Sequence, residues 1–344
     1  YIRANQTGGK VTCTSNCDDP LVSVVIPVYN VCGYIQHTLD SAACQTYQNT
    51  EVIMVDDGST DGSANICKTM AMKDGRFKYI RKENGGLSSA RNYGMKHING
   101  DYLVFLDGDD ILASTAIERL LSLAIANDSN LVSCKYEKIT SGERFDGIEA
   151  AGVHVVDARQ HLKMLLLLED ESGSACGKLY GRQLYDFISY PEGQMFEDFG
   201  VTARLIARSS RSVVTDAKLY GYMTRPGSIT AKRKYGPKHI EGMTASLNAV
   251  KDVVLTYPDL QSSLEFFEGA CFVRVTSKLS KELCPSGAYF DRLVTQAKVS
   301  AKRAAANSDA NGIWRARCRL FSISRGLHNV LYGLYGRVTG KVLG

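Results

Sequence analysis

Between residues 21 and 136, short apolar runs alternate with longer segments in which apolar positions recur every three or four residues. The first pattern is typical of buried β-strands and the second of amphipathic helices. The predicted strands cover residues 21–27, 51–55, 77–81, 101–106 and 131–136. The predicted helices cover residues 34–44, 63–72, 88–97 and 114–126. This alternation predicts an α/β fold with a mostly parallel sheet flanked by helices.

The alternation loosens after residue 139, and the pattern is helical throughout beyond about residue 235. The loosened part predicts a loop over 140–153, helices over 158–168 and 197–208, and mixed short elements over 178–185 and 211–223. The helical part predicts helices over 238–255, 262–281, 289–305 and 313–338. We therefore expect an α/β domain over residues 21–230 and a helical C-terminal extension over 231–344.

Residues 1–20 are polar, with no apolar period, and we expect a disordered leader there. Because the chain begins with Tyr1 and not with Met, we expect its start to be truncated or processed. The composition, with 44% hydrophobic and 22% charged residues, is that of a soluble globular protein. The ten cysteines are scattered through predicted helices and strands, which favours reduced thiols over a disulfide framework. No apolar run is long enough to predict a membrane-spanning helix.

The basic charge of the chain is concentrated at its C-terminal end. The net charge is +5, and six Lys or Arg but no Asp or Glu follow residue 310. Apolar residues recur every seven positions there, at Ile313, Leu320, Leu327 and Leu334, with Trp314 beside them. A basic amphipathic helix of this kind predicts peripheral contact of residues 312–341 with an anionic membrane surface. The alternative is a closing helix that packs on the preceding three.

Acidic or glycine-rich clusters follow three of the predicted strands, at residues 26–30, 56–59 and 107–110. Ligands of open parallel sheets bind at the carboxyl ends of strands, so these clusters are the candidate binding residues. Three carboxylates within four residues, in the run Asp107-Gly108-Asp109-Asp110, repel one another unless a cation offsets them. Mg²⁺ or Mn²⁺ would offset this charge and also bridge phosphate oxygens. The alternative is a solvated turn in which Asp110 caps the next helix.

Two further clusters complete this picture. Asp57 follows the second strand, where its carboxylate is placed to accept a hydrogen bond from a base N–H, whereas Asp61 is expected to be structural. Gly85 and Gly86 open a helix with Arg91 one turn in, an arrangement that suits an anion such as a diphosphate. The dinucleotide Gly-x-Gly-x-x-Gly motif and the Gly-Lys-Ser/Thr phosphate loop are both missing.

Four motifs in this order resemble the family 2 glycosyltransferases of the GT-A fold. They are Val-Ser-Val-Val-Ile-Pro-Val-Tyr-Asn at 22–30, Val-Asp-Asp-Gly-Ser-Thr-Asp at 55–61, Gly-Gly-Leu-Ser-Ser-Ala-Arg-Asn-Tyr-Gly at 85–94 and Phe-Leu-Asp-Gly-Asp-Asp at 105–110. The resemblance resumes at 178–180, 191–193, 197–198 and 225–230, and it covers roughly residues 21–230. It implies a Rossmann-like GT-A catalytic domain.

The resemblance also implies roles for individual residues. The nucleobase, usually uracil, would be held by Asp57 and by the strand-end residues Pro27, Val28 and Tyr29. Asp107 would lie near the ribose and the metal, with Asp109 as the direct metal ligand and Gly108 between them. Asp198 would be the general base, with Glu197 as its neighbour. Candidate phosphate or acceptor contacts, for which simple charge balance is the alternative, are Lys178, Arg225 and Ser228.

Taken with these residues, the resemblance implies a metal-dependent, inverting glycosyltransferase that moves one sugar from a nucleotide-sugar, usually a UDP-sugar, to a glycan or lipid-linked acceptor. We expect it to act in bacterial cell-surface polysaccharide synthesis, in the cytoplasm and peripherally at the inner face of the membrane, with no nucleic-acid partner. A Gln-x-x-Arg-Trp motif is missing, which argues against a processive enzyme. The alternatives are a sugar nucleotidyltransferase, which would need a Gly-rich signature after the first strand, and a non-catalytic sugar-binding module, which would be expected to lose Asp109 or Asp198.

Overall fold

The structure, a computed structural model, describes residues 19–140, 143, 145–169, 173–225 and 234–339. Most of the expected leader over residues 1–20 lies outside this part of the chain, and so do Ser228 and the boundary expected at residue 230. No helix in the described ranges combines the length and the apolar character that a bilayer crossing requires.

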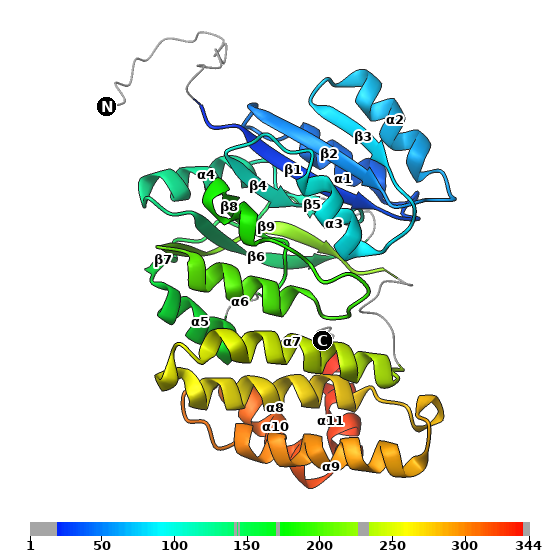
Figure 1. Ribbon diagram of the computed structural model, residues 1–344, viewed down its shortest axis with the longest axis vertical. Helices are drawn as coiled ribbons and strands as arrows, with labels where there is room; N and C mark the ends of the chain where they lie inside the picture. The colour runs from blue at the N-terminus through cyan, green and yellow to red at the C-terminus, as the bar shows by residue number, and fades with distance from the viewer. Residues whose placement is uncertain (1–18, 141–142, 144, 170–172, 226–233, 340–344) are drawn as a thin grey trace.

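A mixed sheet is built from strands within residues 22–223, and its strands run in the order β3-β2-β1-β4-β8-β6-β9-β5, with β7 beside β9 (Figure 1). Strands β3, β2, β1 and β4 are parallel to one another, whereas β8 runs antiparallel to its neighbours β4 and β6. The strands in the described residues are β1 (Val22–Val28), β2 (Thr50–Asp56), β3 (Phe77–Arg81), β4 (Tyr102–Phe105), β5 (Ile111–Leu112), β6 (Leu131–Ile139), β7 (Val153–Val156), β8 (Lys178–Gly181) and β9 (Ser212–Met223).

Helices cover this sheet and continue into the helical extension. Those associated with the sheet are α1 (Ile35–Ala43), α2 (Ser63–Lys73), α3 (Leu87–Met95), α4 (Ala116–Ala126), α5 (Ala158–Leu167) and α6 (Asp198–Arg208). The extension contains α7 (Pro237–Val254), α8 (Gln261–Ser277), α9 (Gly287–Ala304), α10 (Gly312–Ile323) and α11 (Arg325–Thr339). Short 3-10 helices are η1 (Arg182–Phe187), η2 (Pro258–Leu260) and η3 (Lys281–Leu283). The prediction of an α/β domain with a helical extension is confirmed.

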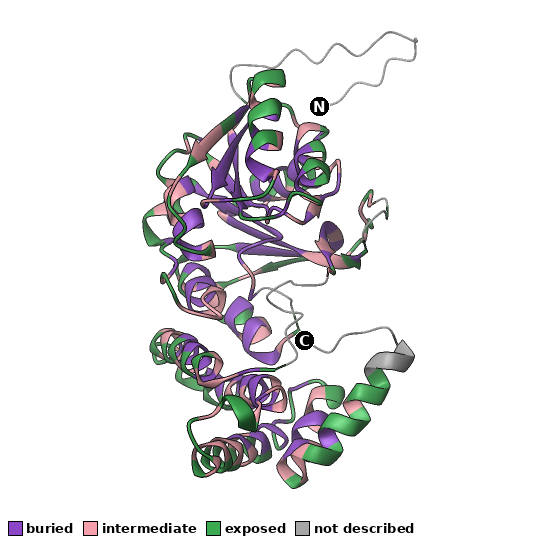
Figure 2. Cartoon of the chain, turned by 90° about the vertical axis from the view of Figure 1, so that its right-hand side faces the viewer, coloured by how far each residue is buried: buried purple, intermediate pink, exposed green. Residues whose placement is uncertain are grey.

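The hydrophobic core continues from the sheet into the extension. Every residue of β1 and β2 is buried, as expected of strands that are covered on both faces (Figure 2). The same core includes Val201 of α6, Met243 of α7 and Phe267 of α8. A second cluster joins α8, α9 and α10 through Phe266, Phe321 and several alanines. Helices α7 and α8 therefore pack directly on the layer that covers the sheet.

The predicted helix over 313–338 is wrong in one respect, because the chain breaks there into α10 and α11. Ser324 is extended, with φ −148° and ψ 113°. A tertiary contact lies next to the break: the Arg325 guanidinium donates to the carbonyl oxygens of Thr276 and Ser277, at the end of α8, and of Leu279. Basic side chains commonly satisfy the last carbonyls of a helix in this way, and here that contact coincides with the break in the predicted helix.

Two strands were also missed or fragmented by the sequence pattern. Residues 211–223 form one long strand, β9, instead of mixed short elements, because β9 pairs with β6, β5 and β7. Strand β7 begins at the end of the predicted loop over 140–153 and pairs antiparallel with β9. Pairing with segments distant in sequence leaves no local signal, so neither element could be predicted from its own residues.

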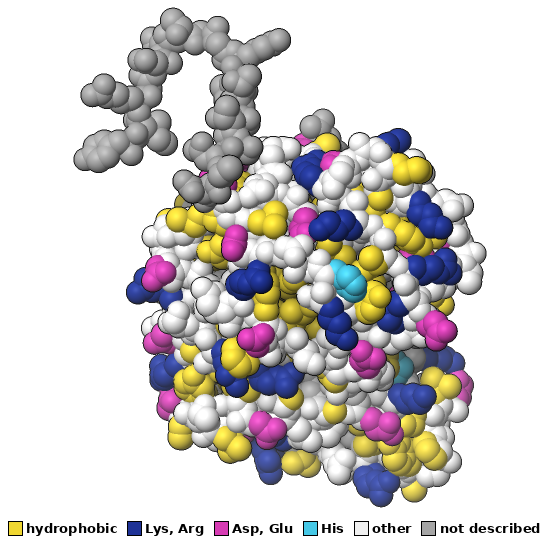
Figure 3. Space-filling model, turned by 45° about the horizontal axis from the view of Figure 1, so that its top comes forward, with side chains coloured by type: hydrophobic (Ala, Val, Ile, Leu, Met, Phe, Trp, Pro, Cys, Tyr) yellow, Lys and Arg dark blue, Asp and Glu magenta, His cyan; other side chains and the backbone are white. Residues whose placement is uncertain are grey.

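On the face shown in Figure 3, basic and acidic side chains are interspersed rather than separated.

Candidate active site

The loops after β1, β2 and β4 meet at one edge of the sheet because these strands are parallel and adjacent. Pro27 and Val28 are buried at the end of β1, whereas Tyr29 is half-exposed. The loop after β4 approaches β1 so closely that a Cβ on Gly108 would lie 2.7 Å from the carbonyl oxygen of Pro27. The Thr38 hydroxyl donates to the Gly108 carbonyl at 3.1 Å. Glycine is therefore required at position 108 for the two loops to meet.

Asp57 lies at the end of β2, with its side chain buried and fully engaged. Its carboxylate accepts hydrogen bonds from Lys82 Nζ at 2.7 Å and from the backbone N–H groups of Gly85 at 3.0 Å and Gly86 at 2.8 Å. The glycine amides expected to face an anion thus bind a carboxylate of the protein in this structure. Lys82 was not predicted from the sequence as a site residue. It lies one residue beyond β3, so a positive charge at the end of the strand next to Asp57 could have identified it.

The other two acidic residues of this turn hold the loop together. Asp56 is fully buried and accepts from the Tyr79 hydroxyl at 2.6 Å. Asp61 accepts from the backbone N–H groups of Cys32 and Ser63, both at 2.9 Å, which ties the loop after β1 to the start of α2. The expected structural role of Asp61 is confirmed.

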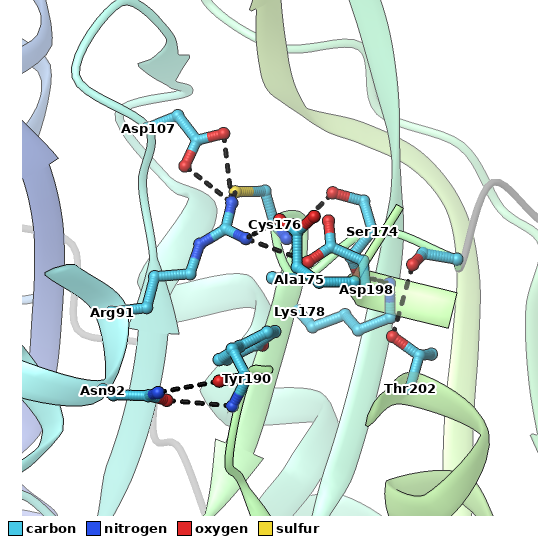
Figure 4. A network of polar contacts seen from close by, with 12 residues as sticks. Arg91, Asn92, Asp107, Ser174, Ala175, Cys176, Lys178, Tyr190, Asp198 and Thr202 are labelled. Atoms are coloured by element: carbon cyan, nitrogen blue, oxygen red, sulfur yellow. Dashed lines mark hydrogen bonds and ion pairs between the residues drawn. The ribbon is translucent and has the colours of Figure 1, made fainter. Parts of the chain in front are cut away.

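Arg91 of α3 lies at the centre of the site, with 1% of its side chain exposed. Its guanidinium forms ion pairs with Asp107 at 2.9 Å, with Asp198 at 2.9 Å and with Glu197 at 3.4 Å (Figure 4). Burial alone would lower the pKa of Arg91, but Asp107 and Asp198 raise it well above its usual value. The side chain expected to reach a diphosphate is thus held by three carboxylates.

Glu197 and Asp198 stand at the beginning of α6, where carboxylates are favoured by the helix dipole. Burial raises the pKa of Glu197 to about 7, with a further contribution from the neighbouring Asp198. Burial also raises the pKa of Asp198, although Arg91 opposes this shift and the backbone N–H of Ala175 donates to the carboxylate. The two carboxyl groups and Arg91 therefore form one coupled set of charges at the start of the helix.

Lys178 of β8 lies next to this pair, and its side chain is 1% exposed. Its Nζ donates to the Ser174 carbonyl at 2.8 Å, and its charge lowers the pKa of Asp198 (Figure 4). A side chain this buried is poorly placed to contact a phosphate or an acceptor. The position of Lys178 therefore favours the other alternative, that it balances the charge of Asp198.

The acidic residues after β4 have two different environments: Asp110 is buried against β9, whereas Asp107 and Asp109 are partly exposed. Asp110 is buried and accepts from the Tyr220 hydroxyl at 2.6 Å and from the Met223 backbone N–H at 2.7 Å. It does not cap α4, whose N-cap is Thr115, and that alternative is wrong because β9 takes the side chain instead. Sequence reasoning missed Tyr220, because the position of β9 could not be predicted.

Asp107 and Asp109 face the site with 26% and 19% of their side chains exposed. Arg225 Nε lies 2.5 Å from Asp109 Oδ2, and the guanidinium is 5.2 Å from the centre of the Tyr34 ring. Burial and the charge of Asp107 raise the pKa of Asp109, whereas Arg225 lowers it. Two partly exposed carboxylates that repel each other are suited to a hard divalent cation.

A cavity of about 290 Å³ opens beside Glu197, between α6, α7 and residues 189–194. Gln194 and Arg204 contribute polar groups to its wall, and Ala245 and Ala249 contribute apolar ones. The carboxyl pair is therefore bordered on one side by the acidic loop after β4 and on the other by a hollow large enough for a small polar group.

Comparison with known proteins identifies relatives of this chain. Residues 23–185 match the family model described as glycosyl transferase family 2. GlyG, a glycosyltransferase of Streptococcus pneumoniae, is 30% identical over 224 residues, which cover 61% of this chain and 72% of GlyG. GlyA, a glycosyltransferase of the same organism, is 31% identical over 225 residues, which cover 62% of this chain. The match spans only about a third (32%) of the length of GlyA.

Among solved structures, residues 1–349 of TarS from S. aureus in complex with UDP-GlcNAc match with a TM-score of 0.62 and 19% sequence identity. The match covers 94% of this chain and 93% of the TarS fragment. At this level of identity the likeness concerns the fold, and it extends over the helical extension as well as the sheet.

Proposed function

The chain belongs to glycosyl transferase family 2, and from this premise we propose that it transfers one sugar from a UDP-sugar to a glycan or lipid-linked acceptor with inversion. The single observation that carries the proposal is the position of Arg91. Its guanidinium contacts Asp107, from the loop after β4, and Asp198, at the start of α6. It therefore joins the loop that would hold the donor to the carboxylate that would activate the acceptor.

The nucleotide end of the donor is proposed to lie over the ends of β1 and β2. The exposed ring of Tyr29 offers a stacking surface beside Asp57, which would accept a base N–H while Lys82 holds its other oxygen in place. The TarS structure contains UDP-GlcNAc, which supports a uridine nucleotide as the donor here. Gly108 keeps the loop after β4 against Pro27, so that Asp107 and Asp109 would stand next to the ribose and the diphosphate.

Asp107 and Asp109 are the residues that would hold Mn²⁺ or Mg²⁺. Their two carboxylates offer hard oxygen ligands. The described residues contain no group of three His, Cys, Asp or Glu side chains placed to hold a metal ion, so the proposed site would take its remaining ligands from the donor diphosphate or water. When bound, the ion would neutralise the charge that develops on the leaving diphosphate. Arg225, which now pairs with Asp109, would then be released, and we propose that it contacts a diphosphate oxygen together with Ser228.

Transfer with inversion is an in-line displacement at the anomeric carbon of the donor sugar. The acceptor oxygen forms a bond to this carbon, the bond to the diphosphate oxygen breaks, and the proton of the acceptor hydroxyl must leave. Asp198 is proposed to take that proton, and Arg91 orients its carboxylate and opposes the rise in its pKa that burial causes. Glu197 has a pKa of about 7, so it can also bind a proton beside Asp198. It borders the cavity in which an acceptor would lie.

The retention of Asp109 and Asp198, both partly exposed, supports a catalytic protein over a non-catalytic sugar-binding module. The residues after β1 contain no Gly-rich signature, which disfavours a sugar nucleotidyltransferase. We also propose a role in cell-surface polysaccharide synthesis. Its acceptor would be carried on a lipid at the cytoplasmic face of the membrane.

Peripheral membrane contact is proposed for the C-terminal part of residues 312–341. In α11, Leu327, Val330, Leu331 and Leu334 are 45–60% exposed, and no Asp or Glu follows residue 310. An exposed apolar helix face with basic surroundings suits the interface of an anionic bilayer. We propose α11 rather than α10 for this contact, because α10 buries Cys318 and Phe321.

A thermal-shift screen of nucleotide sugars with and without Mn²⁺ tests the proposed function. A donor at about 100 times its Kd stabilises the folded state by about 2.7 kcal/mol, so the correct donor raises the midpoint of unfolding. A Mn²⁺-dependent rise with a UDP-sugar is expected. If no nucleotide sugar shifts the midpoint, the proposed donor is wrong.

A further inference from the structure

Three basic side chains gather where the end of α8 meets α10, outside the site described above. Arg274 and Lys278 are four residues apart at the C-terminal end of α8, so they lie on one side of that helix. The guanidinium carbons of Arg274 and Arg317 lie 5.9 and 4.5 Å from the centre of the Trp314 ring. Lys278 Nζ lies 5.3 Å from the centre of the Tyr235 ring. We call Arg274, Lys278 and Arg317 the basic cluster.

The basic cluster has no carboxylate partner among the described residues. Nearby acidic side chains are paired elsewhere, Glu268 with Lys251 at 3.1 Å and Glu282 with Lys234 at 2.6 Å. The carbonyl groups at the end of α8 do not serve either, because Arg325 occupies them. The three cations therefore lack the compensation that partly buried charges normally have.

Hydrogen-bond donors are also left over in this cluster. Arg317 is 4% exposed, and its Nε donates to His328 Nε2 at 3.3 Å, but its Nη1 has no partner; the buried Nε of Arg274 has none either. Burial, together with the charges of Arg274 and Arg317, lowers the pKa of Lys278, and burial with Arg274 lowers that of Arg317 to about 10. An anion bound between these groups would relieve the repulsion and satisfy the donors.

Lys278, one member of the basic cluster, is linked through Tyr235 to the segment that precedes the carboxyl pair. Tyr235 is linked to the cluster because its N–H donates to the Lys278 carbonyl at 2.9 Å. On its other side, the Tyr235 ring lies 6.3 Å from that of Phe196, the residue before Glu197. The rings of Tyr235 and Phe196 therefore connect Lys278 with the start of α6.

We propose that Arg274, Lys278 and Arg317 bind a phosphate group of the acceptor, a phosphate ester or diphosphate that links its glycan to a carrier. The guanidinium groups match the geometry of phosphate oxygens, and the Trp314 and Tyr235 rings hold the basic side chains in place. The assignment of this phosphate to the acceptor rests on the proposed function, whereas the phosphate-binding site itself does not depend on it. The phosphate could belong to a free acceptor or to a lipid headgroup at the membrane, since both present the same chemistry.

The test is a calorimetric titration of the full chain with inorganic pyrophosphate, in EDTA so that no metal-dependent binding at the donor site contributes. The variant combines Arg274→Gln with Lys278→Gln, because both side chains are partly exposed and their loss should leave the fold intact. The matched control combines Lys302→Gln with Arg303→Gln, two exposed residues of α9 outside the cluster. We expect pyrophosphate affinity to fall at least about tenfold in the variant and to stay within about twofold in the control.

Two further measurements separate the outcomes. UDP affinity in the presence of Mn²⁺ should be unchanged in the variant; if the wild-type chain fails to bind UDP, the proposed function is wrong and the phosphate site still stands. Cosedimentation is measured with vesicles of phosphatidylcholine alone and with equal amounts of phosphatidylglycerol. A loss of phosphatidylglycerol binding in the variant assigns the site to a lipid headgroup, and unchanged vesicle binding assigns it to a free acceptor phosphate. Wild-type affinity for pyrophosphate in the variant, or none in the wild type, would overturn the proposal.

Discussion

Nη1 of Arg91 lies 2.9 Å from Oδ1 of Asp198, although the two residues are 107 positions apart in the chain. Arg91 comes from α3 and Asp198 from the first position of α6, so the contact exists only when the sheet and its covering helices are assembled. The same guanidinium also reaches Asp107. Arg91 is therefore expected to be a positioning residue that holds the proposed base and the donor loop in register.

Arg91→Gln should destabilise the fold and abolish transfer. It leaves Asp107, Glu197 and Asp198 without their buried counter-charge, and breaking a buried pair in this way costs about 3–5 kcal/mol. The free energy of unfolding is measured by denaturant titration. The control is Arg119→Gln, which removes an exposed ion pair with Glu149 and should cost about 1 kcal/mol or less. Equal effects of the two substitutions would contradict the role assigned to Arg91.

Asp198→Asn and Glu197→Gln should have different effects on transfer. Loss of a general base lowers kcat by about a hundred- to ten-thousandfold, so we expect this loss for Asp198→Asn with UDP affinity unchanged. Glu197→Gln should retain measurable transfer. It should also remove an ionisation near pH 7 from the pH profile of kcat/KM, because burial and Asp198 raise the pKa of this carboxyl to about 7. An unaltered profile in Glu197→Gln would assign that ionisation to another group.

The same raised pKa predicts how stability depends on pH. The folded state binds the Glu197 proton more tightly than the unfolded chain, whose carboxyl titrates near 4.5. The stability contributed by this group is therefore fully present below pH 4.5 and is lost as the pH rises through about 7. Glu197→Gln should consequently raise the midpoint of thermal unfolding, relative to the wild type, more at pH 8 than at pH 5. Scanning calorimetry at the two pH values provides the comparison.

Asp109→Ala should abolish Mn²⁺-dependent donor hydrolysis and transfer, because it removes the proposed direct metal ligand. Asp110→Asn is the control at the adjacent position, since Asp110 binds Tyr220 and Met223 rather than facing the site. It should keep Mn²⁺ affinity within about twofold, because an amide oxygen can still accept from the Met223 N–H. Mn²⁺ binding is followed by electron paramagnetic resonance. Normal turnover in Asp109→Ala would rule out this residue as the metal ligand.

Vesicle binding should depend on the exposed face of α11. Leu327→Gln combined with Leu331→Gln should lower cosedimentation with anionic vesicles at least about tenfold, because each leucine would contribute about 1.5–3 kcal/mol when buried in the interface. Met72→Gln combined with Ile125→Gln changes two even more exposed apolar residues, on α2 and α4, and should have no such effect. If the two variants bind vesicles equally, α11 is not the membrane contact.

The sequence by itself determined the fold class and the identities of the residues at the strand ends. Continuous apolar runs and helical periodicity are local, and the parallel order of β1, β2 and β4 brings the ends of these strands to one edge. For this reason Asp57 and the run from Asp107 to Asp110 could be predicted to lie together. The helices of the extension were predicted on the same local grounds, apart from the break at Ser324.

Only the tertiary structure decided which partner each of these side chains takes. Arg91 binds carboxylates, Asp110 binds β9, Lys178 is buried, and Arg325, next to the break between α10 and α11, binds the end of α8. Each contact joins segments that are far apart in the chain or depends on burial by them. The direction and burial of a side chain follow from the packing of distant elements, and the periodicity of its own segment carries no record of that packing.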